Sequence, residues 1–202
     1  MNRAGFVLVG GASSRMGRDK AWLPYCGVPL ARHVASRVLE AAGAVALVGP
    51  PERYSSLGFP VIPDAFPGSG PLGGIRTALE ASAARWNLVA ACDMPGLEPA
   101  FLRQLFDAAE REGGDALVPV SPEGRPEPLC AVWRLGCAGA LREALARGVR
   151  KVAGALAELR VAYWPVREPA WLENLNTPQD WARRCRRDSG AIHRPPPGPT
   201  SR

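Results

Sequence analysis

The residues best suited to chemistry lie in the first loop of the chain, between Leu8 and Lys20. The apolar run 6–9 leads directly into a segment of small residues that also holds two cations, Arg15 and Lys20. Glycine lets a backbone approach a ligand closely and point N–H groups at it. Arginine and lysine supply charge that matches phosphate oxygens. The arrangement predicts a phosphate-binding loop at the carboxyl end of a strand.

This loop matches neither of two common phosphate-binding motifs. A P-loop has the form G-x-x-x-x-G-K-[ST], but Arg15 stands five positions after Gly10 and Met16 five positions after Gly11. The dinucleotide fingerprint G-x-G-x-x-G also fails, because Ala12 stands two positions after Gly10. Spacing alone leaves two interpretations open: a phosphate loop of another kind, or a tight turn with solvated cations.

Two aspartates follow apolar runs further along the chain. Asp93 comes after the uncharged run 88–92, and Asp64 comes after 61–63. Because ligands of α/β sheets bind beyond the carboxyl ends of the strands, both carboxylates are expected at the same edge as Gly10. Mg²⁺ takes oxygen ligands and needs only one or two carboxylates besides substrate phosphates, so Asp93 is a candidate metal ligand. The alternatives are a helix-capping Asp93 and a turn residue at Asp64.

The segment 8–20, continued by Gly27-Val28-Pro29-Leu30, resembles the nucleotidyltransferase signature L-A-G-G-x-S-x-R-M-G-x-D-K. Later segments follow in the order found in the molybdenum cofactor guanylyltransferases of that superfamily. They are Pro63-Asp64 with Gly70-Pro71-Leu72-Gly73-Gly74, Cys92-Asp93-Met94-Pro95 and Asn174-Leu175-Asn176-Thr177-Pro178. The resemblance covers about residues 5–182. The first motif is specific to the superfamily, and the last two narrow the resemblance to this family.

The resemblance implies a reaction. The terminal phosphate of molybdopterin, or of its metal-loaded form, attacks the α-phosphorus of GTP, and pyrophosphate leaves. GTP and molybdopterin are then the substrates, and Mg²⁺ held by Asp93 is the cofactor. Phosphoryl chemistry of this kind depends on positioning and charge neutralisation. A phosphate monoester with a second pKa near ~6 needs no general base.

The resemblance also implies roles for individual residues. The implied catalytic residues are Arg15, Lys20 and Asp93. The implied nucleotide contacts are Leu8, Val9, Gly10, Gly11, Lys20, Asp64 and Asp93. Asn174 and Asn176 would contact the metal or the phosphate on the pterin side, with loop and cap chemistry as their alternative. Three positions depart from the family: Val9 replaces the usual alanine, Gly49 stands where relatives often carry a nucleotide-contacting asparagine, and Gly73 replaces the commoner alanine before Gly74.

Three other functions stay open. A cytidylyltransferase acting on the same pterin shares the first motif but tends to have Gln after C-D, where this chain has Met94. A sugar-1-phosphate nucleotidylyltransferase is a second alternative, although such enzymes are usually longer. A non-catalytic nucleotide-binding or cofactor-binding partner is the third.

Composition excludes several classes of protein. Five cysteines form no C-x-x-C pair, which argues against a disulfide framework or a zinc site. The two histidines, His33 and His193, are too few for histidine-based catalysis or a metal cage. No apolar run approaches the roughly 20 residues of a membrane helix, and the N-terminus lacks the pattern of a signal peptide. We therefore expect a cytoplasmic protein without a membrane partner.

Most of the net charge of +6 comes from the last 20 residues of the chain. Residues 183–202 hold six arginines against the single acid Asp188, whereas 1–182 are nearly neutral. We therefore expect a solvated helix end and no nucleic-acid partner. Other cofactor-synthesis proteins or molybdoenzymes are expected as transient partners. The domain boundaries follow: 1–187 form the nucleotidyltransferase domain, and 188–202 a disordered tail that contains Pro and Arg.

Strand-like and helical patterns alternate along the chain, as expected for one domain of 202 residues. The expected strands are 5–10, 44–48, 59–62, 88–92, 116–120, 129–134 and 160–164. The expected helices are 30–42, 72–85, 99–113, 137–147, 151–158 and one that Thr177-Pro178 begins. The pattern predicts an α/β fold: a single Rossmann-like domain whose mostly parallel sheet has helices on both faces, with a small antiparallel element at 116–134.

Overall fold

The computed structural model describes residues 2–10 and 19–192 of the chain, and side chains as far as Arg187. A seven-stranded sheet forms the centre of the molecule, with strand order β5-β4-β1-β6-β8-β7-β9. These strands are β1 (Arg3–Leu8), β4 (Val45–Val48), β5 (Val61–Ile62), β6 (Trp86–Ala91), β7 (Ala116–Val120), β8 (Cys130–Arg134) and β9 (Val161–Pro165). A separate hairpin pairs β2 (Pro24–Tyr25) with β3 (Val28–Pro29).

Most pairs of the central sheet are parallel, and β8 is the exception. It runs antiparallel to both β6 and β7, whereas β1, β4, β5 and β6 pair in parallel, as do β7 and β9. The expected α/β class, the mostly parallel sheet and the antiparallel element at 116–134 are therefore confirmed.

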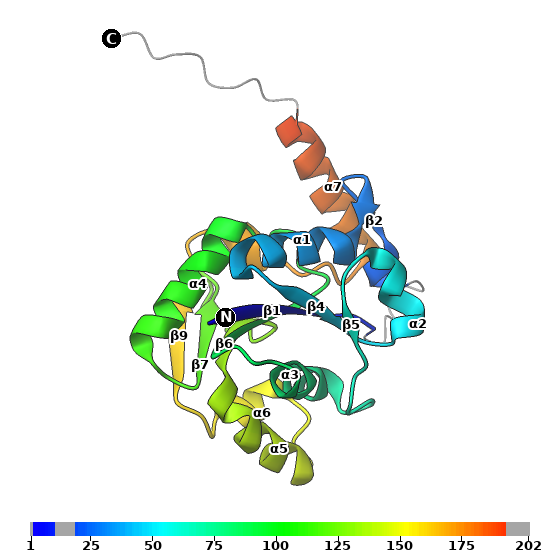
Figure 1. Ribbon diagram of the computed structural model, residues 1–202. Helices are drawn as coiled ribbons and strands as arrows, with labels where there is room; N and C mark the ends of the chain where they lie inside the picture. Colours follow the sequence, from blue (N-terminus) through cyan, green and yellow to red (C-terminus); the bar gives the residue numbers. More distant parts are fainter. Residues whose placement is uncertain (1, 11–18, 193–202) are drawn as a thin grey trace, which may run out of the picture.

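Helices cover both faces of the sheet (Figure 1). One face carries α1 (Leu30–Ala42) and α4 (Pro99–Glu112), and the other carries α3 (Gly70–Glu80), α5 (Ala138–Ala146) and α6 (Val152–Leu156). The short α2 (Pro51–Tyr54) follows β4, and α7 (Pro178–Ile192) extends away from the body. Four 3-10 turns complete the described residues: η1 (Lys20–Trp22), η2 (Ser55–Leu57), η3 (Leu135–Cys137) and η4 (Pro169–Leu172).

The apolar pattern of α1 explains its fit to the sheet. Leu30, Val34 and Val38 recur at helical spacing and are fully buried. The helix ends at Gly43, whose φ of 78° gives a left-handed cap. Burial of this face supplies the main stabilising term for the layer, since each such side chain contributes about 1.5–3 kcal/mol when removed from water.

The predicted elements exist, with shifted ends. The first strand runs over Arg3–Leu8 rather than 5–10, because Gly10 takes a φ of 93° that an extended strand does not allow. The helix expected at 72–85 begins at Gly70 and ends at Glu80. Beyond it, the buried Asn87 accepts a hydrogen bond from Ser82 and holds this segment in a non-helical turn.

The end of the chain also extends further than its pattern indicates. Thr177 caps α7 as predicted: its hydroxyl accepts from the Asp180 amide at 3.1 Å, and Asp180 accepts in return from the Thr177 amide at 3.0 Å. The helix continues to Ile192, five residues past the expected boundary at 187. Residues 193–202 lie outside the described part, so the division into domain and tail stays a prediction.

Candidate active site

A cavity of about 830 Å³ opens at the carboxyl edge of the parallel strands. Three of its lining residues stand two positions beyond a strand end: Gly10 after β1, Asp64 after β5 and Asp93 after β6. The strands bring them to one edge because parallel neighbours end on the same side of a sheet. The residues expected to bind a ligand at this edge therefore do share one cavity.

The predicted site residues fall into two groups. Those that line the cavity are Leu8, Val9, Gly10, Lys20, Asp64, Asp93, Asn174 and Asn176. Gly11 and Arg15 lie outside the described residues. The cavity also contains two acidic residues that sequence reasoning missed, Asp19 and Glu127.

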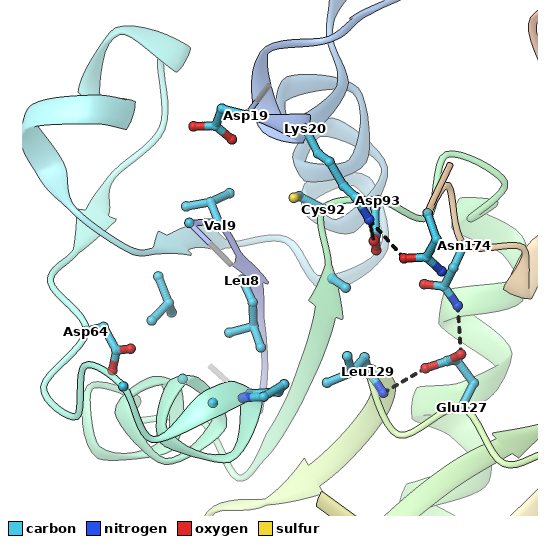
Figure 2. A pocket seen from close by; sticks show the side chains of 18 residues that line it. Leu8, Val9, Asp19, Lys20, Asp64, Cys92, Asp93, Glu127, Leu129 and Asn174 are labelled. Carbon is cyan, nitrogen blue, oxygen red and sulfur yellow. Dashed lines mark hydrogen bonds and ion pairs between the residues drawn. The ribbon is translucent and has the colours of Figure 1, made fainter. Parts of the chain in front are cut away.

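Lys20 connects three distant segments of the chain at the cavity wall. Its Nζ donates to Oδ2 of Asp93 at 2.8 Å and to Oδ1 of Asn176 at 2.9 Å (Figure 2). The side chains of Lys20 and Asp93 are only 15% and 17% exposed, so water screens this ion pair less than a surface pair. One carboxylate oxygen and one amide oxygen thus bind a single positive charge.

Asp19 anchors the residue before this lysine. Its Oδ1 accepts from the amide of Ala21 at 3.1 Å, which caps η1. Its Oδ2 accepts from the hydroxyl of Tyr54 at 2.7 Å and from Arg53 at 2.6 Å. Burial, and next the hydrogen bond to Asp19, raises the pKa of Tyr54, so its hydroxyl stays a donor. The sequence offered one signal for this role: aspartate, the type of residue 19, is a preferred N-cap residue, and it stands directly before Lys20.

Asp64 is held in one orientation next to α3. Its Oδ1 accepts from the amide of Phe66 and from the hydroxyl of Thr77, both at 3.0 Å. The same hydroxyl also lies 3.0 Å from the carbonyl of Gly73, so its single hydrogen is shared between two acceptors. A carboxylate fixed in this way is positioned before any ligand arrives.

Glu127 lies on the opposite side of the cavity from Asp64 (Figure 2). Its Oε2 accepts from Nδ2 of Asn174 at 2.8 Å, and its Oε1 accepts from the amide of Leu129 at 3.2 Å. Burial raises the pKa of Glu127, while the two hydrogen bonds oppose that shift. No motif in the sequence marks this residue, because its contact with Asn174 arises from the packing of the β7–β8 turn against segment 174–176.

Segment 174–176 alternates between the cavity and the core. Leu175 is fully buried, and its amide donates to the carbonyl of Asp93 at 2.8 Å. The asparagines on either side, Asn174 and Asn176, both line the cavity. This backbone contact therefore fixes both amide side chains next to the metal candidate Asp93.

The surroundings of Gly49 explain why this chain has glycine where relatives often carry asparagine. A Cβ at this position would lie 2.7 Å from the carbonyl oxygen of Val9 and 2.8 Å from its Cγ2. Such contacts are too short for any side chain. With Val9 in place, the backbone therefore requires glycine at position 49.

The fold, with a cavity at the carboxyl edge of its parallel strands, is that of a nucleotidyltransferase. The chain belongs to the family of MobA-like NTP transferase domains, whose model matches residues 5–160. A molybdenum cofactor guanylyltransferase of Cupriavidus taiwanensis is 33% identical over 181 residues, covering 86% of this chain and 91% of that protein. A probable molybdenum cofactor guanylyltransferase of Nostoc is 37% identical over 188 residues, covering 90% and 89%.

Solved structures agree with this assignment. The molybdopterin-guanine dinucleotide biosynthesis protein A of Archaeoglobus fulgidus superposes with a TM-score of 0.80 at 32% identity, covering 93% of this chain and 99% of that chain. A CMP:2-keto-3-deoxy-manno-octonic acid synthetase shares the fold at a TM-score of 0.73 and 13% identity, covering 94% of this chain and 99% of that chain.

No helix in residues 2–10 and 19–192 is long and apolar enough to cross a bilayer.

Proposed function

We propose that the protein transfers the guanylyl group of GTP to the terminal phosphate of molybdopterin, giving the guanine dinucleotide form of the cofactor and pyrophosphate. Relatives named for this activity match about nine-tenths of the chain. The observation that carries the proposal is the shared contact of Lys20 with Asp93 and Asn176 on the wall of a large cavity. It joins three motifs, far apart in sequence, at the edge where the substrates would meet.

The chemistry needs no proton acceptor from the protein. An oxygen of the molybdopterin phosphate forms a bond to the α-phosphorus of GTP, the bond to the β-phosphate oxygen breaks, and pyrophosphate takes the electron pair. The attacking monoester is largely ionised at neutral pH because its second pKa is about 6.

The nucleotide side of the site is proposed at the first loop. Leu8, Val9, Gly10 and Gly11 would present backbone groups to the nucleotide, and the fixed carboxylate of Asp64 would contact it from the side of α3. Lys20 and Arg15 would neutralise charge on the leaving pyrophosphate. In this structure Asp93 and Asn176 hold the ammonium, so the lysine would leave these oxygens to bind phosphate once Mg²⁺ takes its place.

Asp93 and Asn176 fit a magnesium ion. Their oxygens bind one cation in this structure, the ammonium of Lys20, and Mg²⁺ prefers oxygen ligands together with substrate phosphates. The ion would neutralise charge on the phosphates of GTP. Substrate phosphates and water would complete the coordination, as is usual for Mg²⁺. No group of three or more His, Cys, Asp or Glu able to hold a metal occurs within the described residues.

A pyrophosphate-release assay tests the proposal. Purified protein with Mg²⁺ and molybdopterin is expected to release pyrophosphate with GTP and not with CTP. Release with CTP alone would establish the cytidylyltransferase instead. Release with a sugar 1-phosphate, but not with molybdopterin, would favour the sugar nucleotidylyltransferase. No release with any pair would support the non-catalytic binding partner.

Three further expectations stay predictions. They are a cytoplasmic location, transient contact with other cofactor-synthesis proteins or with molybdoenzymes, and no binding to nucleic acid or membrane. The arginines of α7 described as exposed, Arg183, Arg186 and Arg187, are distributed over a helix that leaves the body. Arg187 pairs with Glu173 at 3.3 Å.

A further inference from the structure

We infer that Glu127 is a positioning residue for the transfer: it turns the amide oxygen of Asn174 toward the second substrate, where that oxygen accepts a hydrogen bond from an N–H or O–H group of the pterin. This inference rests on the proposed function and adds to it a residue on the side of the cavity away from the nucleotide loop.

The Asn174 amide has a defined orientation. Its Nδ2 lies 2.8 Å from a carboxylate oxygen of Glu127 and 3.4 Å from the carbonyl oxygen of Leu172. Both partners are acceptors, so the atom that faces them must be the nitrogen, which has two N–H groups to donate. Turning the amide over would place oxygen against oxygen on both sides. The amide oxygen is therefore the atom left to face a ligand.

Glu127 is itself fixed as an acceptor. Its second carboxylate oxygen accepts from the amide of Leu129 at 3.2 Å, so each of its oxygens meets a donor. The half-buried position makes this arrangement hard to exchange for water. The glutamate thereby determines which end of the Asn174 amide reaches the site.

Asn176 has the opposite orientation. Lys20 can only donate, so the atom of Asn176 that lies 2.9 Å from its Nζ is the oxygen. One asparagine thus directs its oxygen at the cation, and the other directs its nitrogen at an anion. A phosphate is rich in acceptor oxygens, which the oxygen of Asn174 would repel. The pterin ring, which carries N–H groups, is the part of the second substrate that matches Asn174.

The place of Asn174 in the cavity indicates that it would contact the second substrate rather than GTP. Asp64 and Glu127 lie on opposite sides of the cavity, with Lys20 and Asp93 nearer to Asn174 (Figure 2). The nucleotide would use the loop after β1 and the side of α3. Because the nucleotide would not cover the wall made by Glu127, Leu129 and Asn174, a second substrate could bind there.

Glu127→Gln tests the inference with little change in shape. Glutamine has one oxygen and can serve either Asn174 or Leu129, but not both, so the Asn174 amide loses its fixed orientation. The KM for molybdopterin is expected to rise about fivefold to tenfold, the worth of one hydrogen bond, while the KM for GTP and the Mg²⁺ dependence stay unchanged. The exposed Glu123 lies in the same turn, and Glu123→Gln should have no effect.

A double-variant cycle separates positioning from direct contact. Because Glu127 acts through Asn174, Glu127→Gln should add nothing to the defect of Asn174→Ala. Fully additive defects, a change in the KM for GTP, or an E127Q enzyme with wild-type constants would each overturn the inference. Failure of the wild-type protein to form product from GTP and molybdopterin would instead overturn the proposed function.

Asn174→Asp supplies a rescue. Aspartate has oxygen at both ends, so in E127Q/N174D the amide nitrogen introduced by E127Q can donate to one oxygen while the other faces the site. The KM for molybdopterin should then fall back toward the wild-type value. A double variant no better than E127Q would show that the negative charge at position 127 itself is required, and would exclude amide orientation as its role. Thermal unfolding of each variant identifies any that fails to fold.

Discussion

Nζ of Lys20 lies 2.8 Å from Oδ2 of Asp93, although the two residues are 73 positions apart in the chain. The same ammonium contacts Asn176 at 2.9 Å. The lysine therefore occupies the position between two oxygens that would also suit a metal ion. We therefore expect Lys20 and the metal to compete while the nucleotide is absent, and to act together only when phosphates are present to bind the lysine.

Lys20→Ala is expected to change metal binding and turnover in opposite directions. Without nucleotide, the variant should bind Mn²⁺, a probe for Mg²⁺, about tenfold more tightly, which corresponds to ~1.4 kcal/mol, because no ammonium has to be displaced. With both substrates, turnover should fall about 10²-fold, because charge on the leaving pyrophosphate loses its partner. Calorimetric titration and pyrophosphate release measure the two effects. Lys151→Ala, which removes the other, exposed lysine, is the control.

Asp93→Asn is expected to reduce turnover by about 10²- to 10³-fold and to leave the fold intact. Asparagine keeps an oxygen that can accept from Lys20, so the contact between the two segments survives. The lost negative charge weakens metal binding. Steady-state kinetics with a thermal unfolding curve measure both properties. Activity within tenfold of the wild type would remove Asp93 from the metal site.

Tyr54→Phe is expected to destabilise the protein by about 1 kcal/mol, which lowers Tm by roughly 2–4 °C in a chain of this size. The buried hydroxyl donates to Asp19 at 2.7 Å, and its loss leaves one acceptor without this donor and the segment before Lys20 less fixed. Calorimetry gives the Tm. Tyr163→Phe, at a side chain that is 56% exposed, should leave Tm unchanged.

Gly49→Ala is expected to cost about 1–3 kcal/mol of folding free energy, because the added Cβ overlaps the carbonyl of Val9 at 2.7 Å. Gly139→Ala offers a matched control: nothing lies within 4 Å of the new Cβ, and Gly139 is the second residue of α5, where alanine fits the helical backbone, so no loss of stability is expected. Urea unfolding measures both. Equal stability of the two variants would contradict the steric argument.

Local patterns were enough to predict the layers of the fold. The helical spacing of Leu30, Val34 and Val38 predicted α1 with its observed bounds, and Pro99 with Gly113 bounded α4. Several strand ends moved by one or two residues, because the extent of a strand depends on its pairing with neighbouring strands. Arg3 pairs with Trp86, for example, and no local signal marks that partner.

The site was predictable where a motif carried it and unpredictable where packing made it. Gly10, Asp64 and Asp93 follow strands, and the rule that ligands bind beyond strand ends placed them together. Glu127 stands between two prolines in a turn, Pro126 and Pro128, and nothing nearby indicates a role. The role proposed for Glu127 depends on Asn174, which contacts it only in the folded chain.

His33 predicts a pH dependence of stability. The ring lies half-buried, with Nε2 3.2 Å from the carbonyl of Pro95 and its centre 4.8 Å from that of Tyr25. Burial lowers its pKa below the ordinary 6.5, and the contact with the carbonyl only partly opposes this. Below pH 6.5 the unfolded chain therefore binds the proton more readily than the folded one. Stability is retained above that pH and falls as the pH decreases toward the folded-state pKa.

His33→Gln separates this contribution from that of the carboxylates. Glutamine can still donate to the carbonyl of Pro95 but does not titrate. Unfolding free energies from urea denaturation at pH 7.5 and 5.5 should differ less in the variant than in the wild type. Because every other titrating group is the same in both proteins, the change in that difference belongs to His33. An equal loss of stability in both proteins would show that the folded ring accepts a proton as readily as the unfolded one.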